Sequence, residues 1–293
     1  MRSIQTFLSS YLGLALCIVL LFIGGTLLQF EALQALFQRP SMQSAVKDGM
    51  LCALGTALGA LPVLAVSRIS ERLSNTMLGF GAGVMLAATA FSLLLPALDA
   101  GGSLEYSKWG SGAVVSCGIM LGVLGMLGLE RVMPEQELEQ RDSISAVEPR
   151  ILLFVAAIIL HNIPEGMAVG VAAGGAVEGA ESLALGIALQ DFPEGMVIAL
   201  VLAGAGVNRY KAVGIGAASG LVEPLFAVIS AWLVNFSQMM LPWGLSLAAG
   251  AMLFAVTHEV IPEAHLKKGH RSAATVGLGI GFCLMMVMDT ALG

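Results

Sequence analysis

Residues 161–170 read HNIPEGMAVG, and residues 190–200 read QDFPEGMVIAL. The two stretches share one pattern: His or Gln, then Asn or Asp, any residue, and Pro-Glu-Gly-Met, repeated at an interval of 29 residues. Each lies inside a long apolar run, where ionisable side chains are costly and mark functional positions. The repeat therefore predicts polar chemistry at the centre of two neighbouring membrane helices that run in opposite directions.

The composition is that of an integral membrane protein. Of the 293 residues, 57% are hydrophobic and 12% charged, whereas soluble domains carry roughly 25% charged residues. The mean hydropathy is +0.87. A net charge of −6 argues against nucleic acid as a partner. We expect an all-α protein embedded in a lipid bilayer, with little chain left for a soluble domain.

The chain contains nine apolar runs that approach or exceed the length of about 20 residues needed to cross a bilayer. The first could instead be a secretory signal because Arg2 precedes it, but its long apolar core favours a true span. The predicted spans are 8–29, 48–66, 75–98, 109–129, 151–174, 182–206, 211–236, 243–264 and 272–292.

The basic residues predict the orientation of these spans. With the N-terminus in the cytoplasm, eleven of the fourteen Lys and Arg residues fall in cytoplasmic segments and three, Arg39, Lys47 and Lys108, fall outside. This is the bias of the positive-inside rule. We therefore expect a multi-pass protein of the cell (inner or plasma) membrane, with a cytoplasmic N-terminus and an external C-terminus.

The repeated stretches arrange metal-ligating side chains on helix faces. Residues three or four positions apart share a face, which aligns Glu165 with His161 and Asn162, and Glu194 with Gln190 and Asp191. Pro164 and Pro193 cannot donate backbone hydrogen bonds, so we expect each helix to kink or unwind there. A third span contributes Glu223, which directly precedes Pro224.

Four carboxylates could therefore converge, from Glu165, Asp191, Glu194 and Glu223. Each costs roughly 2.5–3.5 kcal/mol at the bilayer centre on an insertion scale. Bound cations or protonation must offset this cost, and carboxylates with imidazole and amide groups suit divalent metals such as zinc. A protonated, hydrogen-bonded cluster that merely joins helices is the alternative, but it does not explain the repeat.

These motifs resemble the signature of the ZIP (Zrt/Irt-like) metal transporters, in particular the bacterial members of the Bordetella type. The resemblance extends from about residue 48 to the C-terminus. It implies an eight-helix bundle, with the first span as one extra N-terminal helix, and kinked helices around a central metal site. It also implies inward transport of Zn²⁺ or Cd²⁺ by elevator-like alternating access, no organic cofactor, no enzymatic activity and a homodimer.

The resemblance further implies a binuclear metal site. One position would use His161, Glu165, Gln190, Asp191 and Glu194, with a thioether from Met85. The other would use Asn162, Glu165, Asp191, Glu194 and Glu223, so that Glu165, Asp191 and Glu194 bridge the two ions. Without the resemblance, Met85 is one of 16 methionines and reads as a core residue.

We interpret the chain as a single membrane domain over residues 1–293. Residues 1–47 would form the extra helix and an outer loop, residues 48–293 the transporter core, and residues 130–150 an acidic cytoplasmic loop. Many ZIP proteins have a histidine-rich loop at that place, whereas this loop contains no histidine. A metal-sensing role for it is therefore in doubt.

Acidic and histidine residues at the helix ends suggest a route for the ion. Asp99 and Asp289 lie at the outer ends of their spans, where negative charge attracts cations, and are candidates for the metal entrance. His258, Glu259, Glu263 and His265 lie toward the inner side and are candidates for the exit. Ordinary helix-end polar residues are the alternative in both places.

Two functions other than transport are alternatives, an enzyme and a structural scaffold. A membrane-embedded di-metal carboxylate enzyme would be built from Glu-x-x-His pairs, which this chain lacks. A structural scaffold leaves the repeat unexplained. The cysteines lie in apolar runs without metal-like spacing, and we interpret them as small packing residues: Cys17, Cys52, Cys117 and Cys283.

Overall fold

The computed structural model describes residues 35–66, 68–132, 147–265 and 268–292. Within these ranges the chain consists of helices and short turns, and seven helical segments are long and apolar enough to cross a membrane. They correspond to the predicted spans from residue 48 onward, apart from 151–174, so the prediction of an all-helical membrane protein is confirmed. The predicted span 8–29 and most of the acidic loop lie outside the described residues.

Several spans comprise more than one helix. The helical elements are α3 (Pro40–Ala60), η1 (Leu61–Leu64), α4 (Glu71–Ala87), η2 (Ala88–Leu94), α5 (Leu95–Ser103), α6 (Lys108–Val132), α8 (Val147–Gly174), α9 (Ala180–Gly204), α10 (Arg209–Ser219), α11 (Val222–Phe236), α12 (Met240–Ala255), η4 (Val256–Val260), α13 (Ile261–His265), η5 (Lys268–His270) and α14 (Arg271–Leu292). The helix α8 has 28 residues and covers the predicted span 151–174.

Helix ends follow local sequence signals. The Ser70 hydroxyl accepts a hydrogen bond from the Leu73 amide at the start of α4, and Asn208 Oδ1 accepts one from the Tyr210 amide at the start of α10. Such caps satisfy amides that have no partner within the helix. Pro40 begins α3, where its missing amide proton costs nothing. This signal places the start of α3 eight residues before the predicted span.

Two spans contain a π-helical segment, η2 and η4. Each is followed by a proline at the second position of the next α-helix, Pro96 in α5 and Pro262 in α13. A proline cannot donate to the carbonyl four residues earlier, and the helix widens just before it. By contrast, α8 and α9 remain helical through Pro164 and Pro193, so the unwinding considered from the sequence does not occur.

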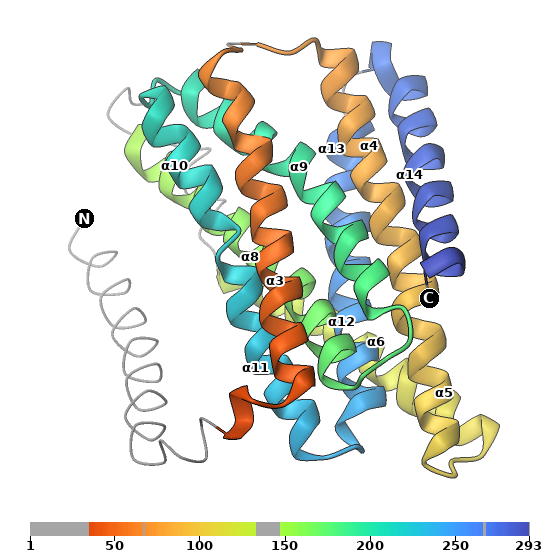
Figure 1. Ribbon diagram of the computed structural model, residues 1–293. Coiled ribbons are helices and arrows are strands. Elements are labelled where there is room, and N and C mark those ends of the chain that lie inside the picture. The colour runs from red at the N-terminus through yellow and green to blue at the C-terminus, as the bar shows by residue number, and fades with distance from the viewer. Residues whose placement is uncertain (1–34, 67, 133–146, 266–267, 293) are drawn as a thin grey trace.

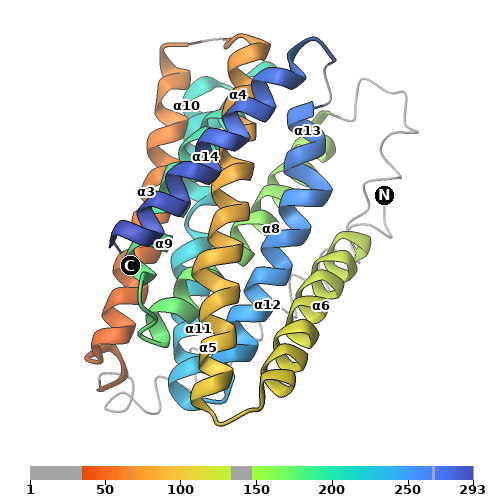
Figure 2. The same cartoon turned by 90° about the vertical axis from the view of Figure 1, so that its right-hand side faces the viewer.

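The helices form one bundle (Figures 1 and 2), and their packing contacts divide it into two groups. In one group, α3 packs against α9, α10 and α11, and α11 packs against α8. In the other, α4 packs against α14, and α12 against α6. The groups meet where α9 contacts α4 and where α8 contacts α12.

Glycines permit the closest helix contacts. A Cβ added at Gly79 or Gly83 of α4 would lie 2.1 or 2.0 Å from a backbone oxygen of α14. On α6, a Cβ at Gly122 would lie 2.2 Å from the Leu247 oxygen of α12. These glycines therefore allow the close helix packing that is common in membranes.

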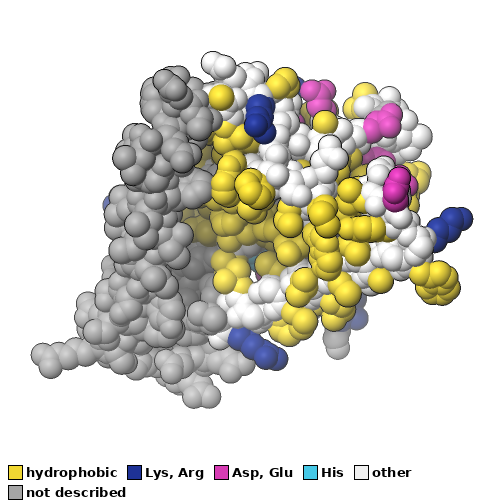
Figure 3. Space-filling view, turned by 90° about the horizontal axis from the view of Figure 1, so that it is seen from below, with side chains coloured by type: hydrophobic (Ala, Val, Ile, Leu, Met, Phe, Trp, Pro, Cys, Tyr) yellow, Lys and Arg dark blue, Asp and Glu magenta, His cyan; other side chains and the backbone are white. Residues whose placement is uncertain are grey.

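Large apolar side chains are exposed at one end of the bundle and along its sides. Figure 3 looks onto the end of the bundle at the bottom of Figure 1 and shows hydrophobic side chains across this face, with charged side chains mainly near its edge. Along the sides, Leu54 and Leu58 of α3 and Leu121 and Leu124 of α6 are exposed. The exposed leucines along the sides are typical of helices that face lipid.

Candidate metal centre

The repeated motifs lie on α8 and α9, at the centre of the first group of helices. Asn162 and Glu165 are buried on α8, and Gln190 and Asp191 are buried on α9. Oxygen atoms of Glu165, Asp191 and Glu194 all lie within 4.8 Å of one another. The structure thus brings together the carboxylates that the two motifs supply.

Gln190 joins the two motifs through hydrogen bonds. Its side-chain nitrogen donates to Glu165 Oε1 and, at 2.6 Å, to Asp191 Oδ1. One oxygen of each carboxylate is therefore occupied. The second oxygens of these carboxylates, Glu165 Oε2 and Asp191 Oδ2, are buried and have no hydrogen-bond partner among the described residues.

The break between α10 and α11 positions Glu223. Pro224 cannot donate to the Gly220 carbonyl, which instead accepts from the Glu223 amide at 3.1 Å. The side-chain nitrogen of Asn162 donates to the Ser219 carbonyl and to Glu223 Oε1, both at 3.1 Å. Glu223 thus reaches the motif of α8 from a separate helix.

Glycines of the motifs allow this convergence. A Cβ at Gly166 would lie 2.5 Å from the Glu223 carbonyl oxygen, and one at Gly195 would lie 2.0 Å from the Thr56 carbonyl oxygen. The glycine after each Pro-Glu pair therefore lets α11 or α3 approach the site. Thr56 in turn donates its hydroxyl to Glu223 Oε1 at 3.2 Å.

The donor set suits a divalent cation. Within the ranges described, the buried side-chain oxygens without a hydrogen-bond partner are Asn162 Oδ1, Glu165 Oε2, Asp191 Oδ2 and Glu223 Oε2. Buried polar atoms normally have partners. The amide oxygen of Asn162 can only accept a hydrogen bond or bind a cation, and the same holds for the three carboxylate oxygens when they are ionised. Zinc takes carboxylate oxygen and histidine nitrogen as ligands, so the residues present fit such an ion.

His161 connects this cluster to η4. It is half-buried, and its Nε2 is in close contact with Glu259 Oε2. The predicted midplane residue and the predicted exit residue are therefore neighbours. Met85 is buried on α4, one turn after Gly81, whose added Cβ would lie 3.7 Å from Gln190 Oε1.

The predicted entrance residues differ in their surroundings. Asp289 accepts a hydrogen bond of 2.6 Å from the Ser92 hydroxyl of η2, in a partly buried position. Asp99 is exposed on α5, and its backbone carbonyl accepts a hydrogen bond from Ser103. Only Asp289 therefore joins two spans.

The predicted exit residues also differ in their contacts. His258 is exposed, contacts Glu130 Oε1 at 3.1 Å and stacks on Phe254. His265 contacts the Ile261 carbonyl and the Thr275 hydroxyl, and Glu263 is exposed. His265 thus links α13 to α14.

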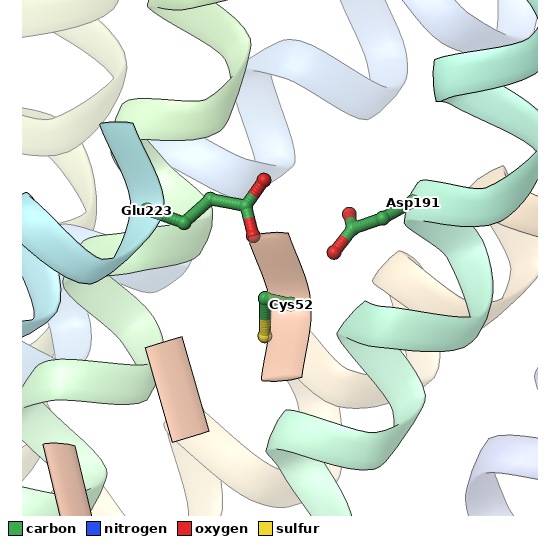
Figure 4. Close-up of side chains that lie close together, drawn as sticks. All are labelled: Cys52, Asp191 and Glu223. Carbon is green, nitrogen blue, oxygen red and sulfur yellow. The ribbon is translucent and has the colours of Figure 1, made fainter. Parts of the chain in front are cut away.

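Sequence reasoning missed the contribution of α3. Thr56 contacts Glu223, and Cys52 lies beside Asp191 and Glu223 (Figure 4). A signal was present: Asp48, Cys52 and Thr56 recur every four residues in an otherwise apolar run and thus share a helix face.

Comparison with known proteins identifies the family. A family model described as "ZIP Zinc transporter" matches residues 133–289. The zinc transporter ZIPB of Bordetella bronchiseptica is 46% identical over 253 residues, covering 85% of this chain and 81% of that protein. The zinc transporter GufA of Myxococcus xanthus is 37% identical, covering 86% of this chain and 100% of that protein. Human zinc transporter ZIP11 is 32% identical, covering 81% of this chain and 94% of that protein.

Transport rather than enzymatic catalysis is the function of this family. The repeated motifs and the comparisons agree, and this chain belongs to the ZIP zinc transporter family.

Proposed function

We propose that this chain carries Zn²⁺, and also Cd²⁺ and related divalent ions, across the cell membrane into the cytoplasm. The observation that carries the proposal is the group of carboxylates from Glu165, Asp191, Glu194 and Glu223. Three of them, Glu165, Asp191 and Glu223, are buried, and each has one oxygen without a hydrogen-bond partner within the described residues. Family membership supports zinc as the substrate, since the similar proteins are named as zinc transporters.

The ions would occupy two adjacent positions. The first would use His161, Glu165, Gln190, Asp191 and Glu194, with Met85 from α4; the second would use Asn162, Glu165, Asp191, Glu194 and Glu223. Gln190 and Asn162 currently donate hydrogen bonds to these carboxylates. To bind an ion, their amides must turn so that the oxygen faces it. Release of zinc would then restore the hydrogen bonds.

The contacts at both ends support a route through the molecule. Asp289, which contacts Ser92, would guide ions inward from the outer side. The exposed carboxylate of Asp99 would attract cations to the entrance. His161 contacts Glu259, so Glu259 would receive an ion from the first position. His258, Glu263 and His265 would then assist release into the cytoplasm.

The two groups of helices suggest how access alternates. The site-bearing group, α3, α8, α9, α10 and α11, would move as an elevator past a scaffold of α4, α6, α12 and α14. Pro164 and Pro193 would bend the moving helices. We propose α8 as the eighth core span, residues 8–29 as an extra helix preceding the core of 48–293, and a homodimer with cytoplasmic N-termini.

The test is metal uptake by sealed proteoliposomes that contain the purified full-length chain. We expect zinc uptake by the wild type and by Glu178→Ala, which removes an exposed carboxylate, but not by Asp191→Ala. A folded wild type that binds zinc but does not transport it would contradict the proposal. Equal uptake by Asp191→Ala would contradict the assigned site.

A further inference from the structure

We propose that Cys52 of α3 is a sulfur ligand in the second metal position, where it favours Cd²⁺ and Zn²⁺ over harder ions such as Mn²⁺. This inference rests on the proposed transport function and adds a ligand that the repeated motifs do not contain. It replaces the interpretation of Cys52 as a packing residue only.

The distances support coordination by this side chain. Cys52 Sγ and one oxygen each of Asp191 and Glu223 all lie within 4.8 Å of one another. Zinc binds sulfur at about 2.3 Å and carboxylate oxygen at about 2.1 Å in tetrahedral geometry, so a sulfur and an oxygen on one ion are about 3.6 Å apart. Small side-chain movements therefore suffice for a shared ion.

The neighbouring carboxylates are not satisfied by the protein. Asp191 Oδ2 and Glu223 Oε2 are buried without hydrogen-bond partners, among the residues described. Figure 4 shows the two carboxylates directed toward the space above Cys52. The thiol itself is fully buried and donates only a weak contact, 3.5 Å long, to the Ala184 carbonyl. This contact engages the S–H group and not the sulfur lone pairs.

The packing of α3 fixes Cys52 at this depth. Cβ atoms added at Gly55 and Gly59 would lie 2.3 and 2.0 Å from backbone oxygens of α9. One added at Gly49 would lie 2.6 Å from Pro224 Cα of α11. Because α3 touches both partner helices through glycine, Cys52 lies between the helix that carries Asp191 and the helix that carries Glu223.

The chemistry of sulfur then predicts selectivity. Thiolates are soft ligands that favour zinc and cadmium, whereas carboxylates also suit manganese and magnesium. When the metal–sulfur bond forms, the S–H bond breaks and its proton leaves to solvent, as in other thiolate sites. A thiolate also neutralises part of the ion's charge in the membrane interior.

Purified full-length protein provides the direct test. In a Cys52-only variant, with Cys17, Cys117 and Cys283 changed to serine, added Cd²⁺ should produce the ultraviolet absorption of a thiolate–cadmium bond. Cys52→Ser should abolish the band, and Cys52→Ala provides a second comparison if the serine variant does not fold. Cadmium binding by the folded Cys52-only variant without the band would overturn the proposal.

Selectivity is measured in proteoliposomes. Cys52→Ser should lower Cd²⁺ uptake relative to Mn²⁺ uptake by roughly tenfold, the low end of the loss seen when a metal site is perturbed. The exposed Cys117→Ser serves as the matched control and should leave the ratio unchanged. An unchanged ratio in Cys52→Ser would contradict the assigned selectivity. Absence of uptake by the wild type despite the thiolate band would refute transport while leaving Cys52 as a ligand.

Discussion

At the scale of single residues, Glu165 has several contacts within the cluster. It lies within ligand-sharing distance of Asp191 and Glu194, accepts a hydrogen bond from Gln190, and has a second oxygen free of hydrogen-bond partners in the described chain. His161, by contrast, is half-buried and contacts Glu259. In the proposed site Glu165 would bind both ions, whereas His161 would bind one.

We therefore expect Glu165→Ala to reduce zinc uptake by about a hundredfold or more and His161→Ala by about tenfold, a range typical of perturbed metal sites. Uptake is measured in proteoliposomes at matched protein content. Wild-type activity in Glu165→Ala would remove the bridging role.

Asn162 has a structural task besides any role in metal binding. It satisfies the Ser219 carbonyl, which the break between α10 and α11 exposes. Asn162→Leu should lower the free energy of unfolding by about 1–3 kcal/mol, because a buried acceptor loses its partner. Thermal unfolding in detergent measures the change, and Gln238→Leu, at an exposed position, is the control. Equal stability of the two variants would argue against this task.

At the scale of elements, the π-helical segments coincide with the ends of the proposed route. Ser92, which contacts Asp289, lies in η2, and Glu259, which contacts His161, lies in η4. Wide helical turns of this kind occur frequently at functional sites. Here the following prolines, Pro96 and Pro262, account for the local change in hydrogen bonding.

Replacing Pro262 tests this account. Pro262→Ala supplies an amide that can donate to the His258 carbonyl, so η4 should revert toward an α-helix and turn Glu259 away from His161. We expect slower zinc uptake, by roughly tenfold, with metal binding at the midplane retained. Pro40→Ala, at the first position of α3, should have no such effect. Unchanged uptake in Pro262→Ala would show that the wide turn is dispensable.

At the scale of the whole molecule, the boundary between the two groups of helices would be the sliding surface. Gly175, after α8, lies against Leu241 of α12, where an added Cβ would be 2.3 Å from a Leu241 methyl carbon. Lys47 of α3 and Glu181 of α9, which form an ion pair of 2.8 Å, lie within one group. The two pairs permit a matched cross-linking experiment.

We expect a cross-link between Gly175→Cys and Leu241→Cys to stop zinc uptake and its reduction to restore uptake, because the link joins the moving group to the scaffold. The link between Lys47→Cys and Glu181→Cys should leave uptake intact. Both are made with Cys17, Cys117 and Cys283 changed to serine. Full uptake by the protein cross-linked at Gly175 and Leu241 would contradict elevator motion.

The sequence by itself determined the helical membrane class, most of the spans and the two polar motifs. These features are local, because the length of an apolar run and the spacing of polar residues can be read from consecutive residues. The repeat at His161 and Gln190 also identified the carboxylates that lie together in the structure. The two proline-linked π-helical segments were not foreseen, since a proline in the sequence does not reveal how the hydrogen bonds before it rearrange.

Only the tertiary structure decided which residues meet. Helical periodicity gives the face on which Cys52 and Thr56 lie, but not that this face meets Asp191 and Glu223 of helices more than 130 residues away. The pairing of His161 with Glu259 likewise depends on how α8 packs against the α12 span. Such contacts arise from close packing at glycines and from burial of polar groups between helices, and neither is encoded in the spacing of any single helix.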